Sequence, residues 1–218
     1  LHFVHRERWE AAMADRSRGI LSFSNHVALF DDPLLISNLS TTRYNDVRWI
    51  GADHKNFFGN ALKGFIYSAG KCVPLIRGAG LEQPGFEFLV ERLKANEWVH
   101  LFPEGGRTRE QGARLRTPFK RGIGRLMADA RPLMLPFYHL GMEGILPIGK
   151  ALPRSGQNVT VYFGRPTLLD DTWWEKHTHG QNDSDALWTT LTNWSQKELE
   201  QLQQEALSYS GGLQEPAP

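Results

Sequence analysis

The sequence contains a single cysteine, Cys72, among its 218 residues. An internal disulfide is therefore excluded, and so is a zinc site built from clustered cysteines. This cysteine usage fits a reducing compartment. No apolar run approaches the roughly 18 residues of a membrane-spanning helix, so we expect no such helix in this stretch. Because the chain begins at Leu1 rather than at a methionine, we expect that a leading segment has been removed or was never included.

The chain also lacks an excess of either charge. It carries 25 Lys and Arg against 24 Asp and Glu, which gives a formal net charge of +1. Nucleic-acid-binding proteins usually show a strong basic excess or stripe, so no nucleic-acid partner is expected. Hydrophobic residues make up 40% of the chain, with 12 Phe and 7 Trp, a composition typical of a folded globular protein. The length suits one domain.

Strand and helix patterns alternate along the sequence. Short apolar runs predict strands over residues 19–26, 47–53, 71–78, 98–103, 132–141 and 158–164. Amphipathic patterns predict helices in the N-terminal stretch to residue 18, over 31–39, 57–70, 85–97 and 118–130, and again from about residue 172. This alternation predicts an α/β fold, a single domain with a mostly parallel central sheet flanked by helices. We expect the domain to span residues 1–207 and a disordered polar tail to follow over 208–218.

The stretch "SNHVALFDDP" places His26 five residues before Asp31, where a predicted strand gives way to a predicted helix. Such a spacing arises by chance about 0.4 times in a chain of this composition, so the pair alone is weak evidence for catalysis. A core histidine beside a helix-capping aspartate is the plain alternative. A neutral histidine can nevertheless take the proton of an attacking hydroxyl, while a carboxylate behind it fixes the tautomer. The pair therefore suits acyl transfer to a hydroxyl of the substrate.

Two further stretches place charged residues at the ends of predicted strands. "PLIRG" carries Arg77, and "FPEGGRTRE" carries Glu104, Gly105, Arg107 and Arg109. An arginine can hold a phosphate with two parallel hydrogen bonds, and glycines let the backbone approach a ligand closely. Each residue also has a simpler interpretation: a surface salt bridge for the first arginine, a paired turn carboxylate for the glutamate, and solvated loop charges for the other two arginines.

The stretches "NHVALFDDP", "GKCVPLIRG", "FPEGGRTR" and "LMLPFYHLG", in this order, resemble the four sequence blocks of the glycerophospholipid acyltransferase family. The resemblance is greatest to the tafazzin branch of that family and runs, with gaps, from about His5 to Pro166. It implies catalytic roles for His26 as the base and for Asp31 as its charge partner. It implies substrate-binding roles for residues of the later blocks: Arg77 for the acceptor's phosphate, Glu104 and Gly105 for the glycerol backbone, and Pro136 near the acyl chain. Phosphate contacts by Arg107 or Arg109 are a further hypothesis.

The activity that the resemblance implies moves an acyl chain from a phospholipid to a hydroxyl of a lysophospholipid, without acyl-CoA, as in cardiolipin remodelling. It implies no metal and no tightly bound cofactor. It also implies a peripheral membrane enzyme, at a mitochondrial membrane in a eukaryote or on the cytoplasmic side of the inner membrane in a bacterium. The apolar residues Phe57, Phe58 and Leu62 are candidates for membrane contact. Neither the headgroup nor the oligomeric state follows from the sequence.

Two departures from the tafazzin pattern leave the acyl donor open. Val27 and Ala28 stand where tafazzins carry a Gln-Ser pair beside the histidine. The third block continues as "GRTR", which is closer to the general lysophosphatidate acyltransferases. The alternative function is therefore a 1-acylglycerol-3-phosphate acyltransferase that uses acyl-CoA or acyl carrier protein. A non-catalytic lipid-binding protein of the same fold is a third possibility.

Overall fold

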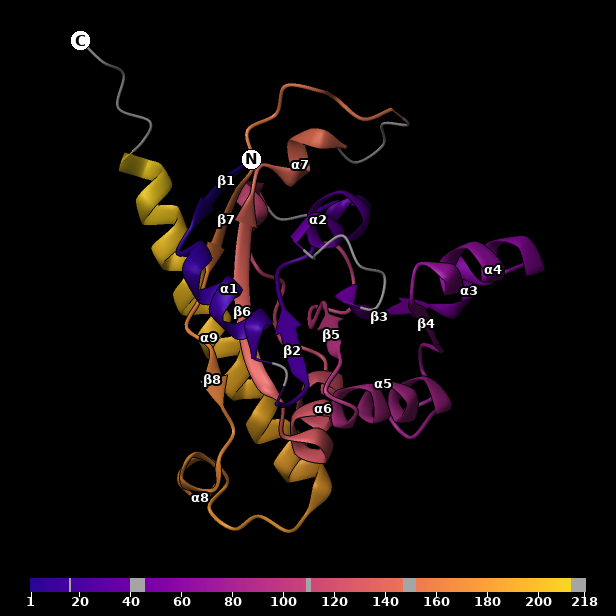
Figure 1. Ribbon diagram of the computed structural model, residues 1–218, viewed down its shortest axis with the longest axis vertical. Helices are drawn as coiled ribbons and strands as arrows, with labels where there is room; N and C mark the ends of the chain where they lie inside the picture. Colours follow the sequence, from indigo (N-terminus) through magenta and orange to yellow (C-terminus); the bar gives the residue numbers. More distant parts are fainter. Residues whose placement is uncertain (16, 40–45, 109–110, 147–151, 213–218) are drawn as a thin grey trace.

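The structure is a computed structural model that describes residues 1–15, 17–39, 46–108, 111–146 and 152–212 (Figure 1). In this part of the chain, eight strands form one sheet in the order β1-β7-β6-β2-β5-β3-β4, with β8 paired to β6. The strands are β1 (His2–Val4), β2 (Ile20–Phe23), β3 (Trp49–Asp53), β4 (Cys72–Leu75), β5 (Trp98–Leu101), β6 (Leu133–Leu140), β7 (Thr160–Phe163) and β8 (Thr167–Leu168).

The sheet is mostly parallel, as predicted. The pairs β1–β7, β6–β2, β2–β5, β5–β3 and β3–β4 are parallel, and only the pairs that β6 makes with β7 and β8 are antiparallel within the described residues. Pro74 lies in β4 at one edge of the sheet, where a missing backbone N–H is tolerated. The proline is therefore accommodated without the loss of a ladder hydrogen bond inside the sheet.

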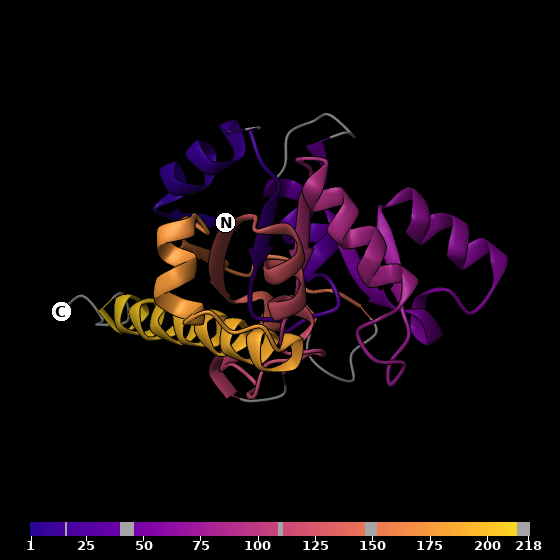
Figure 2. The ribbon, with the colours of Figure 1, turned by 90° about the horizontal axis from the view of Figure 1, so that it is seen from below.

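Helices cover both faces of the sheet, and Figures 1 and 2 show α1 and α9 on opposite sides of it. The helical elements are α1 (Arg6–Ala14), η1 (Asp31–Ile36), α2 (Ser37–Leu39), α3 (His54–Phe57), α4 (Ala61–Ala69), α5 (Pro84–Lys94), η3 (Gln111–Ala113), α6 (Gly122–Ala130), α7 (Met142–Ile145), α8 (Asp171–Thr178) and α9 (Ser184–Gly212). Side chains alternate across each strand, so Val99 of β5 joins the core under α5, α6 and α9, while Trp98 joins the core under α1 and η1. Burial on both faces explains why the strands are continuous apolar runs.

A glycine in α6 allows α6 and α9 to pack closely. A Cβ on Gly124 of α6 would lie 2.0 Å from the carbonyl oxygen of Trp188 in α9, so only glycine fits at this crossing. The tryptophans near the C-terminal end also face the protein: Trp173, Trp174 and Trp194 pack against the core under α9.

The structure corrects three of the expected boundaries. The N-terminal stretch is not one helix to residue 18, because β1 comes first and pairs with β7, and α1 ends at Ala14. The predicted helix over 57–70 is two helices, α3 and α4, because Asn60 caps a new helix through its side chain. Helix α9 continues to Gly212, five residues into the predicted tail, and residues 213–218 lie outside the described part.

Candidate active site

The two sequence motifs meet at the carboxyl ends of the neighbouring parallel strands β2 and β5. Phe23, the last residue of β2, is in register with Leu101, the last residue of β5. His26 and Glu104 each lie three residues beyond those ends, so the strand pairing alone places them side by side. The backbone N–H of His26 donates to Oε1 of Glu104 over 2.7 Å.

His26 and Asp31 form the expected pair. The ring nitrogen Nδ1 of His26 lies 2.9 Å from Oδ2 of Asp31, whose side chain is completely buried. The same carboxylate oxygen accepts the backbone N–H groups of Val27 at 2.6 Å and Ala28 at 3.0 Å. Asp31 also opens η1, where a negative charge is favoured by the helix dipole. The carboxylate therefore fixes both the loop and the histidine ring.

The other ring nitrogen of His26 is open. Its ring stacks on Phe102 with centroids 4.0 Å apart and planes 15° apart, and about a fifth of the side chain is exposed. Among the residues that the structure describes, none makes a hydrogen bond to Nε2. Because Asp31 accepts the Nδ1–H proton, the lone pair of a neutral ring resides on Nε2. This nitrogen can take a proton from a substrate hydroxyl.

A second buried histidine supports this loop from β6. The side-chain amide of Asn25 donates to the carbonyl oxygen of His139 at 2.9 Å, and the backbone N–H of His139 donates back to Oδ1 of Asn25 at 3.0 Å. Nε2 of His139 lies 3.0 Å from the Asn25 carbonyl oxygen and 3.8 Å from Oδ2 of Asp31. Burial lowers the pKa of His139, which keeps the ring neutral beside the carboxylate at neutral pH. These contacts tie the catalytic loop to the centre of the sheet.

Glu104 is a buried clamp between two backbone segments. It is 1% exposed, and while Oε1 accepts from His26, Oε2 accepts the backbone N–H of Arg116 at 2.7 Å. Burial raises the pKa of the Glu104 carboxyl to about 7, although both backbone hydrogen bonds act to lower the pKa. The predicted turn carboxylate is thus paired with main-chain donors, and contact with an acceptor's glycerol backbone stays a prediction.

Two guanidinium groups converge on the turn after β5. A Cβ built on Gly106 would lie 3.6 Å from Nη1 of Arg116 and 3.9 Å from Nη2 of Arg77. The side chain of Arg77 is 68% exposed and pairs with Asp53 at the end of β3. The Asp53 side chain is only 11% exposed, so the exposed part of this ion pair is the guanidinium group, which an anion can reach from solvent.

The remaining predicted residues of this turn are placed as follows. Gly105 has a φ of 70°, and a Cβ there would lie 2.7 Å from Cγ of Lys120, so the turn needs glycine for its backbone conformation and for packing. Arg107 is exposed one residue beyond Gly106. Arg109 lies outside the described residues, so its predicted phosphate contact stays a prediction.

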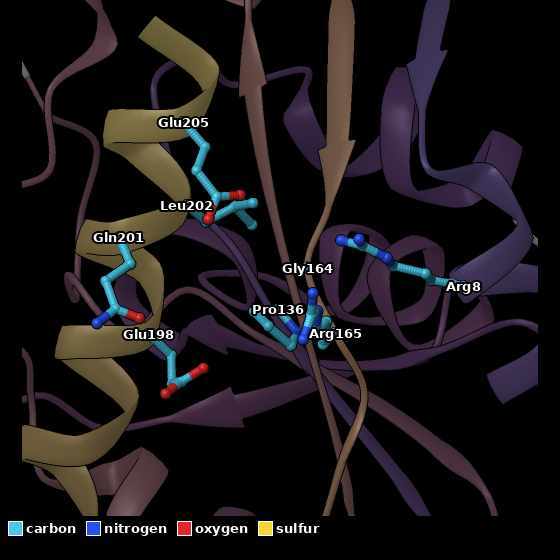
Figure 3. A pocket seen from close by; sticks show the side chains of 8 residues that line it. All are labelled: Arg8, Pro136, Gly164, Arg165, Glu198, Gln201, Leu202 and Glu205. Atoms are coloured by element: carbon cyan, nitrogen blue, oxygen red, sulfur yellow. The ribbon is translucent and has the colours of Figure 1, made fainter. Parts of the chain in front are cut away.

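Pro136 does not join this group. It lies within β6, and its ring faces α9, where it lines a polar pocket (Figure 3). The other lining residues come from α1, from the two residues after β7 and from α9: Arg8, Gly164, Arg165, Glu198, Gln201, Leu202 and Glu205. His139 is three residues further along β6 and points to the opposite face of the sheet, toward Asp31. A role for Pro136 beside the acyl chain stays a prediction that no contact with His26 supports.

Sequence reasoning missed four residues that shape the site: Asn25, Phe102, Arg116 and His139. Two of them adjoin predicted residues, in "NH" and "FPEG", and these neighbours were the available signal. His139 and Arg116 reach the site only through the sheet order and through a backbone bond to Glu104. Nothing in the local sequence indicates either contact.

The fold defines the chain as an α/β protein. Its candidate active site, a buried aspartate behind an accessible histidine, lies at the carboxyl ends of parallel strands, where the sites of α/β proteins usually lie. The family model described as Acyltransferase matches residues 5–140, more than half of the chain. The chain belongs to this acyltransferase family, as the sequence blocks predicted.

The chain is also similar to several individual proteins. The chain is 33% identical to a tafazzin of Drosophila melanogaster over 175 residues, which cover 77% of this chain and 46% of the relative. It is 35% identical to a "Taffazin" of Dictyostelium discoideum over 163 residues, covering 70% and 56%, and 29% identical to an N-acylphosphatidylethanolamine synthase of Arabidopsis thaliana over 165 residues, covering 69% and 56%. The chain thus spans about half the length of these relatives. The resemblance to the tafazzin branch is confirmed.

A solved structure shares the fold. The 1-acyl-sn-glycerophosphate acyltransferase PlsC from Thermotoga maritima superposes with a TM-score of 0.55, covering 92% of this chain and 72% of PlsC, at 16% identity. The similarity supports the fold prediction, an α/β domain of the glycerolipid acyltransferase type.

Proposed function

We propose that this protein transfers a fatty acyl chain from a phospholipid to a hydroxyl of a lysophospholipid at a membrane surface. The observation that carries the proposal is the His26–Asp31 pair, with 2.9 Å between Nδ1 and the carboxylate and with Nε2 open. Membership of the acyltransferase family and similarity to tafazzins support it. Contact with the membrane surface is part of this proposal. Among the described residues, no helix is long and apolar enough to cross a bilayer.

The reaction requires one proton to be moved twice. Nε2 of His26 takes the proton of the acceptor hydroxyl as its oxygen bonds to the acyl carbonyl carbon of the donor. Asp31 stabilises the imidazolium that forms, because its carboxylate already receives the Nδ1–H. When the tetrahedral intermediate collapses, the bond from the carbonyl carbon to the donor's glycerol oxygen breaks, and that oxygen takes the proton from Nε2. The acceptor leaves acylated, the donor leaves as a lysophospholipid, and the histidine is neutral again.

Arg77 and Arg116 hold the phosphate of the acceptor in this proposal. Both guanidinium groups lie beside Gly106, which has no side chain to block an approaching headgroup. Arginine binds phosphate oxygens through paired N–H donors and keeps its charge at any physiological pH. Arg107 is exposed next to them and adds positive charge. Glu104 acts on this site indirectly, by holding the backbone of Arg116 against that of His26.

The alternative donor, acyl-CoA or acyl carrier protein, would use the same histidine. A donor test separates the two with purified protein and vesicles that contain a lysophospholipid. One arm offers acyl-CoA with a labelled acyl chain, and the other offers only a phospholipid with labelled acyl chains. We expect label to move from the phospholipid. Label moving from acyl-CoA alone would assign the chain to the biosynthetic acyltransferases, and label moving in neither arm would leave the lipid-binding function.

A further inference from the structure

The segment between β3 and β4 projects from the edge of the sheet as a helical hairpin, α3 and α4 (Figures 1 and 2). No residue of α4 is buried, in contrast to α5 and α6, which each bury several residues against the sheet. A nine-residue helix gains little stability by itself, so it usually needs an apolar face packed on the protein. Here the larger part of that face has no protein under it.

The outward face of α4 is strongly apolar. Leu62 is 70% exposed, Phe65 is 74% exposed and Ile66 is 56% exposed. Their spacing of three and four residues puts them on one side of the helix. The inward side is held by Tyr67, whose ring packs against Phe57 with centroids 4.9 Å apart. The helix is therefore amphipathic with its apolar side turned away from the domain, an arrangement that marks an interaction surface.

The charge around this face has one sign. From residue 54 to residue 81 the sequence contains no Asp or Glu, although it contains Lys55, Lys63, Lys71 and Arg77. Lys71 is buried, but Lys55 and Lys63 are exposed on the two helices. Apolar side chains flanked by lysines are the pattern of helices that lie in the headgroup region of anionic bilayers. A second protein would need acidic groups at the same points and a matching apolar groove, whereas a bilayer supplies both over any area.

The base of the hairpin adjoins the phosphate-binding arginine. Asp53, the last residue of β3, caps α3 by accepting the backbone N–H of Asn56 at 3.0 Å. The same aspartate pairs with the guanidinium group of Arg77. Ile76, next to that arginine, is a further exposed apolar residue, with 54% of its surface accessible. Asp53 therefore joins the base of the hairpin directly to the arginine of the candidate active site.

We propose that the outward face of α4, formed by Leu62, Phe65 and Ile66, inserts into the headgroup and upper acyl region of an anionic phospholipid bilayer. Lys55 and Lys63 then lie at the level of the lipid phosphates. Insertion brings Arg77 to the same level, so that a lysophospholipid presents its phosphate to the site while its acyl chain stays in the bilayer. The role of insertion in presenting a lysophospholipid rests on the proposed function. Vesicle binding itself can be measured without enzymatic turnover.

The test compares flotation with vesicles of 70% phosphatidylcholine and 30% phosphatidylglycerol. The double variant Leu62→Ser/Phe65→Ser removes the inserting face, and Leu168→Ser, an exposed leucine of β8 remote from the hairpin, is the matched control. Burial of one such side chain is worth at least about tenfold in partitioning, so the double variant should bind about a hundredfold more weakly. The control should bind as the wild type does. Because Leu62 and Phe65 are 70% and 74% exposed, the double variant should melt at the temperature of the wild type.

A labelling experiment tests insertion directly. An environment-sensitive fluorophore is attached at Phe65→Cys in a Cys72→Ser background, with Leu168→Cys as the matched label position. Emission at position 65 should shift to the blue when anionic vesicles are added, and emission at position 168 should not. Wild-type partitioning by the double variant, or an unshifted label at position 65, would overturn the proposal. The proposal would also be overturned if the wild type were a dimer and the double variant a monomer that binds vesicles as well as the wild type does. The apolar face of α4 would then be a contact between two copies of the chain.

The two proposals fail in distinguishable ways. Acyl transfer to a short-chain lysophospholipid dissolved below its micelle concentration does not require insertion, so the double variant should keep it within about twofold while losing transfer in vesicles. Vesicle binding with no transfer by the wild type in either format would overturn the enzymatic function alone. Loss of transfer in both formats by a folded double variant would instead assign the hairpin to the catalytic machinery and overturn its role in insertion.

Discussion

Replacing Glu104 tests whether it serves as a backbone clamp. Its two oxygens accept the N–H groups of His26 and Arg116 at 2.7 Å each, in a site that is 1% exposed. Glu104→Gln keeps the shape but has only one carbonyl oxygen, so one backbone donor meets an amide N–H₂ and stays unpaired. A buried donor without a partner costs about 1–3 kcal/mol. Glu104→Ala removes both acceptors and leaves a cavity, so a loss of about 3–5 kcal/mol is expected.

The free energy of unfolding should also depend on pH, because the pKa of Glu104 differs between the folded and the unfolded protein. Burial raises the pKa of Glu104 from the ordinary 4.5 to about 7, so between these values the folded protein holds a proton that the unfolded chain has released. Stability therefore falls as the pH rises through this window. The part of the unfolding free energy due to Glu104 is fully present below pH 4.5 and decreases by about 2–3 kcal/mol between pH 5 and pH 8. Glu104→Gln has no proton to lose and lacks this slope.

Urea unfolding at pH 5, 6, 7 and 8 measures both effects, with the wild type and Glu104→Gln compared at each pH. We expect the wild type to be more stable at pH 5 and its advantage to shrink as the pH rises. An advantage that stayed constant, or grew with pH, would refute a protonated Glu104 in the folded state. Full stability of Glu104→Ala at pH 5 would refute the clamp itself.

Three further predictions concern the charge of Asp31, phosphate binding by Arg116 and the packing of α6 on α9. Asp31→Asn keeps an oxygen for the backbone donors but removes the negative charge. Acyl transfer should therefore fall about 10–100-fold, while the urea midpoint should shift less than it does in Asp31→Ala. Arg116→Ala should raise KM about tenfold for a lysophospholipid and leave KM for a monoacylglycerol unchanged in steady-state assays. Gly124→Ala places a Cβ 2.0 Å from the Trp188 carbonyl oxygen and should destabilise the protein by about 2 kcal/mol or more. Gly64→Ala is the control, because the nearest atom to its Cβ would lie 3.9 Å away. Its melting temperature should equal or exceed that of the wild type.

The sequence was sufficient for those features that depend on local pattern. The inner strands are apolar runs because both faces of the sheet are covered, and such runs are visible without coordinates. The His26–Asp31 pair is also local, since the five-residue turn into η1 closes on itself through backbone donors. The three-residue β1 was missed because an edge strand of that length has too few residues to show a period.

Features that depend on which segments become neighbours could not be predicted. The contact of Glu104 with the backbone of His26 follows from the register of β2 and β5, which no local pattern encodes. His139 meets Asp31 only because β6 lies beside β2. An apolar helix face has the same sequence pattern whether it packs on the domain or faces outward. The exposure of the apolar face of α4 could therefore be seen only in the structure. The face of β6 on which Pro136 lies also required the structure: its ring faces α9, and its role beside the acyl chain stays a prediction.

The most direct test of the proposed mechanism is the rate of acyl transfer from a labelled phospholipid to a lysophospholipid in vesicles, measured for wild type and His26→Ala. Asp31 keeps its hydrogen bonds to Val27 and Ala28 in this variant, so the loop should stay folded, which circular dichroism and vesicle flotation can check. We predict that transfer falls by about 10²–10⁴-fold, the usual contribution of a general base. Transfer by a folded His26→Ala at the wild-type rate would contradict the assignment of His26 as the base.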